Sequence, residues 1–172
     1  MTVKQLYGLV WVYIISVIAC REMGEINVVL DEKDTISNQV RKIADNIAIV
    51  KTVDDKSTGL AGIISSQYKM FLNLMYRATN KELLLLTSNS SPNVRAYSFW
   101  GLAKKGVNMK PILDSHINDT SNFIFNSGCI IHNTKINNFF LLLLTENYID
   151  SDIRKLDNNE VSGYKKLIEK KS

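Results

Sequence analysis

The sequence predicts an all-α fold of about six or seven short helices that pack as antiparallel pairs, with minor extended segments. Apolar residues recur at intervals of three and four over most of residues 36–172, which is the spacing of one face of a helix. Helix-capping residues stand before successive apolar runs. Turns of only two to four residues separate three of these runs within residues 79–119. Such short connections place neighbouring helices antiparallel.

Two helices are predicted in the first part of this region, over residues 36–50 and from about residue 66 to residue 78. Residues 51–65 between them lose the helical spacing and contain two glycines, which predicts a loop or hinge. The inward faces of the two helices carry Ile36, Val40, Ile43 and Ile47 in the first, and Tyr68, Phe71, Leu74 and Met75 in the second.

The next two helices carry clear start signals. Thr79 and Glu82 have the spacing of a capping box and open a short, nearly all-apolar helix that we expect to be buried on most sides. Ser91 and Pro92 predict the start of the following helix, because serine accepts a free amide and proline has no amide to leave unpaired. Gly106 predicts its end, since glycine readily takes the left-handed conformation.

The remaining elements follow the same reasoning. Asn108 is expected to cap a helix that continues to about residue 119. Residues 120–133 alternate phenylalanine with polar residues, which predicts a short extended segment or an ordered loop. Another helix is predicted over residues 134–149, and Asp157 with Glu160 forms an acidic capping box before the last helix.

A stretch of about forty residues carries a more specific motif. Its matching positions are Pro92, Val94, Arg95, Ala96, Leu102, Gly106, Ile112 and Leu113. In this pattern residues 82–119 resemble the HEAT-repeat family, with two departures. Ser90 and Ser91 stand where an aspartate commonly pairs with the arginine, and bulky Phe99 and Trp100 replace small residues. The resemblance implies a short HEAT-like α-solenoid over residues 36–172, whose exposed ridge binds other proteins.

The amino terminus contains an apolar run of about fourteen residues after Lys4, shorter than the roughly 20 residues that span a bilayer. Its last four residues, Val17-Ile18-Ala19-Cys20, resemble the lipobox of bacterial lipoproteins, although Ile18 is bulkier than usual. The resemblance implies a signal peptide at 1–19, cleavage before an acylated Cys20, a tether at 20–35 and a helical domain at 36–172. An uncleaved helical anchor and an incidental or buried cysteine are the alternatives.

The candidates for chemistry are few. Cys129, His132 and His116 could be considered as zinc ligands or, for the first two, as a nucleophile pair. A second ligand pair and an orienting acid are missing from the pattern, as are phosphate-loop, dinucleotide and zinc-protease motifs. We therefore expect no metal, no cofactor and no catalysis. The net charge of +4 comes from scattered groups, which gives little support for nucleic-acid binding.

These observations predict a non-catalytic protein-interaction module, held by lipid on the bacterial envelope and facing the periplasm or the exterior. Its partner is an unknown protein, and no small-molecule substrate is expected. Arg95 has two interpretations: it braces successive repeats by hydrogen-bonding loop carbonyls or a carboxylate, or it joins Tyr97 or Trp100 as an exposed anchor for the partner. An envelope enzyme or small-ligand binder that uses the Cys129/His132 region is the alternative, and a purely structural envelope protein is a third.

Overall fold

The structure is a computed structural model that describes residues 35–58 and 63–170. The chain divides into two compact units, Met1–Thr35 and Ile36–Ser172, and the description below concerns the second. The predicted signal peptide, Cys20 and nearly all of the tether lie outside the described residues.

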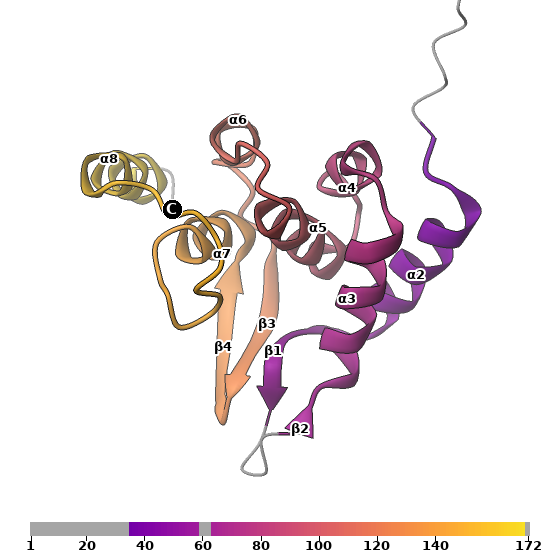
Figure 1. The fold of residues 1–172 in the computed structure, drawn as a ribbon. Coiled ribbons are helices and arrows are strands. Elements are labelled where there is room, and N and C mark those ends of the chain that lie inside the picture. The colour runs from indigo at the N-terminus through magenta and orange to yellow at the C-terminus, as the bar shows by residue number, and fades with distance from the viewer. Residues whose placement is uncertain (1–34, 59–62, 171–172) are drawn as a thin grey trace, which may run out of the picture. The chain divides into compact units, whose positions relative to one another are not determined.

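The fold is mixed α and β (Figure 1). The all-α, HEAT-like solenoid expected from the sequence is therefore wrong, because the described residues contain a sheet as well as seven helices. The order along the chain is α2 (Asn38–Ile49), β1 (Thr52–Thr58), β2 (Ile63–Ile64), α3 (Ser66–Arg77), α4 (Asn80–Leu86), α5 (Pro92–Lys104), α6 (Lys110–Ser115), β3 (Asn122–Gly128), β4 (Ile130–Lys135), α7 (Ile136–Leu143) and α8 (Asn158–Glu169).

The four strands form one sheet in the order β2-β1-β3-β4. β1 pairs in parallel with β3, and the two outer pairs are antiparallel. Val53 of β1 lies opposite Phe125 of β3, and both side chains are buried. The ring of Phe139 in α7 packs 5.1 Å from the ring of Phe125, which fixes the inner face of the sheet against the helices.

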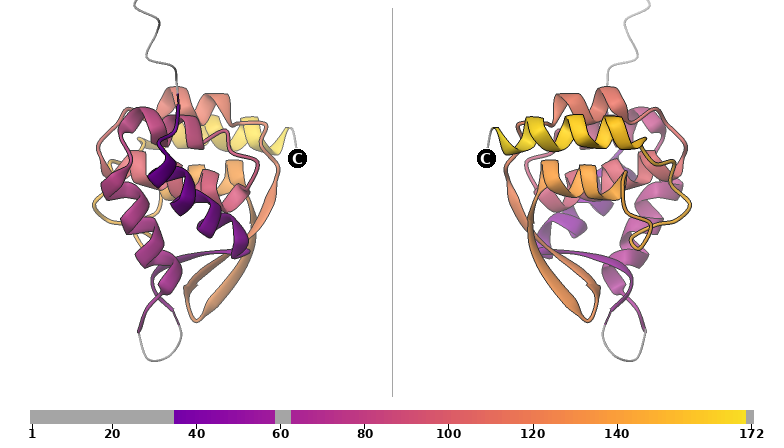
Figure 2. Two further views of the ribbon diagram at one scale, coloured as in Figure 1. Left: turned by 90° about the vertical axis from the view of Figure 1, so that its right-hand side faces the viewer. Right: turned by 90° about the vertical axis from the view of Figure 1, so that its left-hand side faces the viewer.

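Helix α5 is the centre of the core. Every residue from Asn93 to Ala103 is buried, which is typical of a helix with neighbours on all sides. Figure 2 shows α2 and α3 on one side of the unit and α7 and α8 on the other, and α5 packs against α3 and α7. The ring of Phe99 stacks on Phe140 of α7, and Trp100 packs against Phe71 of α3. These large rings fill space between layers that small residues at the same positions would leave empty.

The end of α5 takes the form that the sequence indicates. Gly106 has φ +73°, in the left-handed region, and its amide bonds to the carbonyl of Ala103. The amide of Val107 bonds to the carbonyl of Leu102, which completes a Schellman motif. This turn sets the direction in which the chain leaves α5 for α6.

Several other local predictions are confirmed. Both capping boxes are present, at Thr79 with Glu82 and at Asp157 with Glu160. Residues 120–133 form most of the β3–β4 hairpin, as one of the two alternatives expected.

The loop or hinge predicted over residues 51–65 is wrong, since most of it forms β1 and β2.

Candidate functional site

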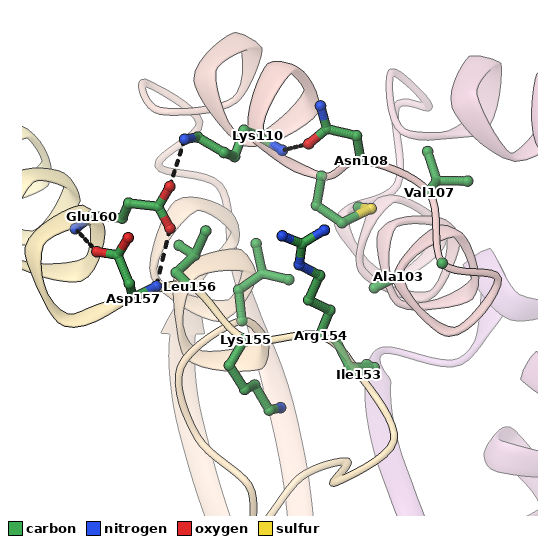
Figure 3. A pocket seen from close by; sticks show the side chains of 13 residues that line it. Ala103, Val107, Asn108, Lys110, Ile153, Arg154, Lys155, Leu156, Asp157 and Glu160 are labelled. Atoms are coloured by element: carbon green, nitrogen blue, oxygen red, sulfur yellow. Dashed lines mark hydrogen bonds and ion pairs between the residues drawn. The ribbon is translucent and has the colours of Figure 1, made fainter.

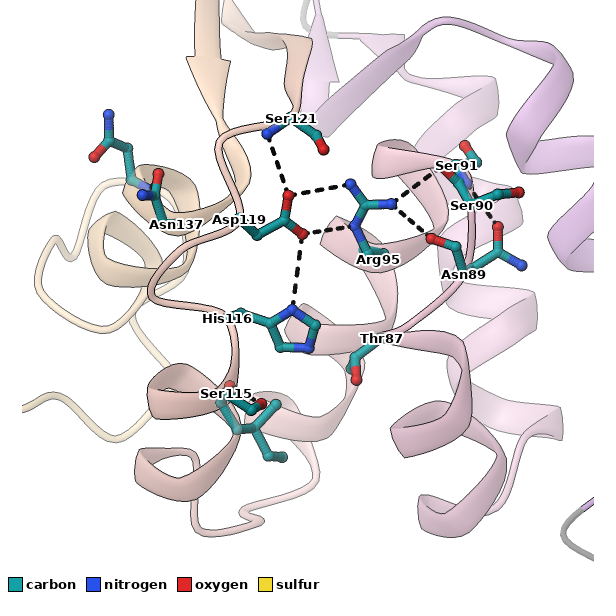
Figure 4. Close-up of polar contacts among 12 residues, drawn as sticks. Thr87, Asn89, Ser90, Ser91, Arg95, Ser115, His116, Asp119, Ser121 and Asn137 are labelled. Carbon is teal, nitrogen blue, oxygen red and sulfur yellow. Dashed lines mark hydrogen bonds and ion pairs between the residues drawn. The ribbon is translucent and has the colours of Figure 1, made fainter. Parts of the chain in front are cut away.

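Arg95 braces the fold from the first turn of α5 (Figure 4). Its Nη1 donates to the carbonyls of Asn89 at 2.6 Å and Ser90 at 3.1 Å, in the turn between α4 and α5. Its Nε lies 2.9 Å from a carboxylate oxygen of Asp119, and its Nη2 donates to the other at 3.3 Å. The contacts expected of a bracing Arg95, with loop carbonyls and a carboxylate, are thereby confirmed, but they join the α4–α5 turn to the loop after α6 rather than successive repeats. The carboxylate comes from the loop after α6, rather than from the serine positions beside the helix start.

Asp119 also contacts Ser121 and His116. It accepts a hydrogen bond from the amide of Ser121, and its Oδ2 lies 3.7 Å from Nδ1 of His116. Burial lowers the pKa of His116 from its ordinary value, and the charge of Arg95 lowers it too, while Asp119 acts in the opposite direction. His116 therefore belongs to a structural cluster that joins the α4–α5 turn to the loop before β3.

Tyr97 and Trp100 are buried, with 0% and 1% of their surfaces exposed. The hydroxyl of Tyr97 accepts a hydrogen bond from the Asp54 amide at 2.7 Å and donates to the Asp54 carbonyl at 3.0 Å. Trp100 Nε1 donates to Asp150, which also pairs with Lys104 at 2.7 Å. Burial alone would raise the pKa of Asp150, but the hydrogen bonds from Lys104 and Trp100 outweigh it and the pKa is lowered. The idea that either ring joins the arginine as an exposed anchor is wrong.

Cys129, His132 and His116 lie on different elements of the structure. Cys129 is exposed in the turn between β3 and β4, whereas the ring of His132 in β4 stacks on its cross-strand neighbour Phe125 in β3. His116 is the C-cap of α6 and contacts Phe140. Within residues 35–58 and 63–170, no three His, Cys, Asp or Glu side chains gather closely enough to hold a metal ion.

A surface groove lies between α4 and α6, above α5. Its volume is about 470 Å³, and its lining is mostly apolar. Leu84 of α4 forms one wall and is 49% exposed, and Pro111 and Ile112 of α6 form the other. Leu102 and Val107, from the end of α5 and its Schellman turn, also line it. We call this hollow the α4–α6 groove.

A second hollow, of about 570 Å³, lies on the other side of the α5–α6 turn (Figure 3). It is bounded by that turn, the segment 153–157 and the first residues of α8, and we call it the Arg154 pocket. The Arg154 side chain runs from the segment 153–157 into the pocket, toward Asn108. Val107 and Asn108 line both hollows, so the turn after α5 is the wall that they share.

One feature of the sequence, a run of four leucines, does indicate an exposed apolar side chain at the α4–α6 groove. Four consecutive leucines, residues 83–86, advance by about 100° each around a helix, so they cannot all face the same side. Leu83 and Leu86 point into the core, and Leu84 points to solvent. The expectation that this helix is buried on most sides therefore fails at Leu84.

No helix in the described part of the chain is long and apolar enough to cross a membrane. Comparison with known proteins places the chain in no family: no family model matches it, and no curated protein matches it.

Proposed function

We propose that this protein is a non-catalytic protein-interaction module, tethered by lipid to the bacterial envelope, and that the α4–α6 groove receives its partner. The observation that carries the proposal is the apolar lining of a groove that is open at the surface. An exposed apolar hollow that a folded domain keeps is characteristic of sites that bind other proteins or ligands.

The groove has the walls of a preformed site. The capping box holds the start of α4, and the Schellman turn holds the chain between α5 and α6. Glu82 adds a long-range tie, because its carboxylate accepts a hydrogen bond from the amide of Ser37 ahead of α2. A site that is already ordered loses little conformational entropy when a partner binds.

The lining supports the proposal of a partner with a particular chemistry. Asn80, Asn108 and Ser115 offer neutral polar groups at the rim, and Lys81 is the one charged residue of the lining. A partner segment with one or two apolar side chains, flanked by neutral or acidic residues, complements this surface.

The lipid tether rests on the sequence alone. The apolar run and the lipobox-like residues before Cys20 support export and acylation. A diacylated or triacylated amino terminus holds a small domain stably on a membrane face. Mass spectrometry of the amino-terminal peptide from membranes tests this part: acylated Cys20 supports it, and an intact Met1 contradicts it.

The groove is tested with a photo-crosslinking amino acid in place of Leu84, using Ile131 on β4, which is also exposed, as the control position. We expect a discrete crosslinked protein from position 84 and not from position 131. The purified partner should then bind the wild type and the Ile131→Glu variant but not Leu84→Glu, as measured by calorimetry. Equal binding by Leu84→Glu and wild type would exclude the groove as the binding site.

A further inference from the structure

We propose that the Arg154 pocket binds a carboxylate attached to a compact apolar group, with Arg154 and Asn108 as the groups that hold the carboxylate. This site differs from the α4–α6 groove in its charge and in most of its lining. It adds a ligand class to the protein that the proposed function does not include.

Most charged groups around the pocket already have partners. Lys110 Nζ lies 2.5 Å from Glu160 Oε1. The other oxygen of Glu160 accepts from the Asp157 amide, and Asp157 accepts from the amides of Asn159 and Glu160. Lys155 donates to three backbone carbonyls at 2.8–2.9 Å. The two carboxylates of the lining are thus used to cap α8 and to pair with Lys110, so neither is left to attract a cationic ligand.

Two sets of donors remain. Among the described residues, no hydrogen bond or ion pair joins the Arg154 guanidinium to a neighbour, and its side chain is exposed toward the pocket. Asn108 uses its carbonyl oxygen to accept from the Lys110 amide at 3.3 Å, which leaves its NH₂ group as a donor. Arg154 and Asn108 both line this hollow, and a guanidinium with several free donors fits a planar oxyanion.

The overall charge of the lining also favours an anionic ligand. Lys110, Arg154 and Lys155 are cationic, and Asp157 and Glu160 are anionic, so the lining has an excess of one positive charge. The pKa of Glu160 is lowered first by the hydrogen bond from Lys110 and then by that from the Asp157 amide, with a smaller contribution from Arg154. Arg154 acts on Glu160 through its charge, without a hydrogen bond between the two side chains.

The remaining wall of the pocket is apolar. Ala103, Met109, Leu144 and Ile153 line it, and all four are buried against the core. A carboxylate at Arg154 would place its neighbouring carbon atoms against this wall. The volume of about 570 Å³ is in the range of pockets that hold small ligands, and it accommodates an amino-acid residue with its neighbour.

This chemistry has two sources: a free carboxylic acid with an apolar side group, or the carboxyl-terminal residue of a peptide. The test measures binding to the full-length chain in detergent micelles by calorimetry. The probes are N-acetyl-leucine, its amide, an acetylated tetrapeptide that ends in leucine, and the same tetrapeptide with an amidated terminus. We expect both acids to bind more tightly than their amides, and tighter binding by one acid identifies the source.

Variants connect the binding to the pocket. Arg154→Gln should weaken binding of the acids by about ten- to a hundredfold, and Arg154→Lys should restore part of it. Arg77→Gln removes the same charge from the exposed end of α3 and should leave binding unchanged. Asn108→Ala provides a second variant, with a smaller loss. Circular dichroism confirms that each variant is folded.

Three results would overturn the proposal: no heat of binding up to about 10 mM acid, equal binding of acid and amide, or unchanged binding by Arg154→Gln. Leu84→Glu should bind the acids like the wild type, so failure of the groove and failure of this pocket are told apart.

Discussion

The carboxylate of Glu82 in α4 accepts a hydrogen bond from the backbone amide of Ser37 at 2.9 Å, across 45 positions of sequence. The same side chain accepts from the amide and the hydroxyl of Thr79, so one carboxylate caps α4 and fixes the entry to α2. Burial would raise the pKa of Glu82, but the hydrogen bonds from Ser37 and Thr79 outweigh it and lower the pKa to about 2.

The depressed pKa of Glu82 predicts a loss of stability in acid. Its folded-state pKa lies below the unfolded value of about 4.3, so the stabilisation is present above pH 4.3 and is lost as the pH falls toward 2. We expect Glu82→Gln to lower the free energy of unfolding by about 2–3 kcal/mol at pH 7 and to weaken the dependence on pH below 4.3. Urea unfolding at pH 7 and pH 3 measures both. Glu169→Gln, at an exposed position on α8, is the matched control and should change little.

Removing Arg95 should destabilise the fold and also change the pKa of His116 in the same cluster. Arg95→Met leaves Asp119 without its ion-pair partner in a largely buried place, for which we expect a loss of about 3 kcal/mol in thermal or urea unfolding. Because the charge of Arg95 lowers the pKa of His116, the variant should raise that pKa. NMR titration of the His116 ring measures the change. A pKa that stays the same or falls would contradict the arrangement of this cluster.

The Tyr97 hydroxyl should contribute to stability although it lies in an apolar core. Tyr97→Phe leaves the amide and the carbonyl of Asp54 without this partner, which should cost about 1–3 kcal/mol in the free energy of unfolding. Tyr76→Phe makes the same chemical change at a ring that is 77% exposed, so its effect should lie within about 0.5 kcal/mol. Equal effects of the two substitutions would show that the hydrogen bonds between the Tyr97 hydroxyl and the Asp54 backbone do not stabilise the fold.

Neighbouring leucines in α4 should behave differently. Leu83→Ala removes a fully buried side chain and should cost about 2–5 kcal/mol, whereas Leu84→Ala lies in the open groove and should cost less than about 1 kcal/mol. Thermal unfolding of the two variants makes the comparison. A large loss for Leu84→Ala would mean that this side chain supports the core rather than the groove wall.

The sequence predicted the helices well and the sheet poorly, for identifiable reasons. The helical faces of α2 and α3 repeat at the expected spacing, and seven of the eight residues named from the pattern are buried. The exception is Ile36, which lies before α2 and is only partly buried. β1 reads TVDDKST, in which Val53 is the one apolar residue, so no alternation marks it as a strand. Its partner β3 lies about 70 residues farther along the chain, and local spacing carries no information about such a pairing.

The candidate sites could not be predicted from the sequence, because the residues that contact one another there are far apart along the chain. Arg95 was identified from its position in a motif, but its carboxylate partner Asp119 is 24 residues away. Tyr97 and Trp100 were considered as surface anchors because aromatic residues dominate binding sites. The neighbours that bury them come from α3, α7 and the sheet, and their positions depend on the tertiary fold.

The parallel pairing of β1 with β3 sets this protein apart from modular repeat proteins, in which units can be removed or duplicated one at a time. Here the strand at residues 52–58 finds its neighbour only after residues 122–128 have been made. The four helices α3 to α6 lie between β1 and β3 in the sequence. A truncated chain that stops before residue 122 would therefore lack β3, the parallel neighbour of β1, and with it the buried side chain of Phe125. The unit that begins at Ile36 should consequently fold in one cooperative step, late in its synthesis.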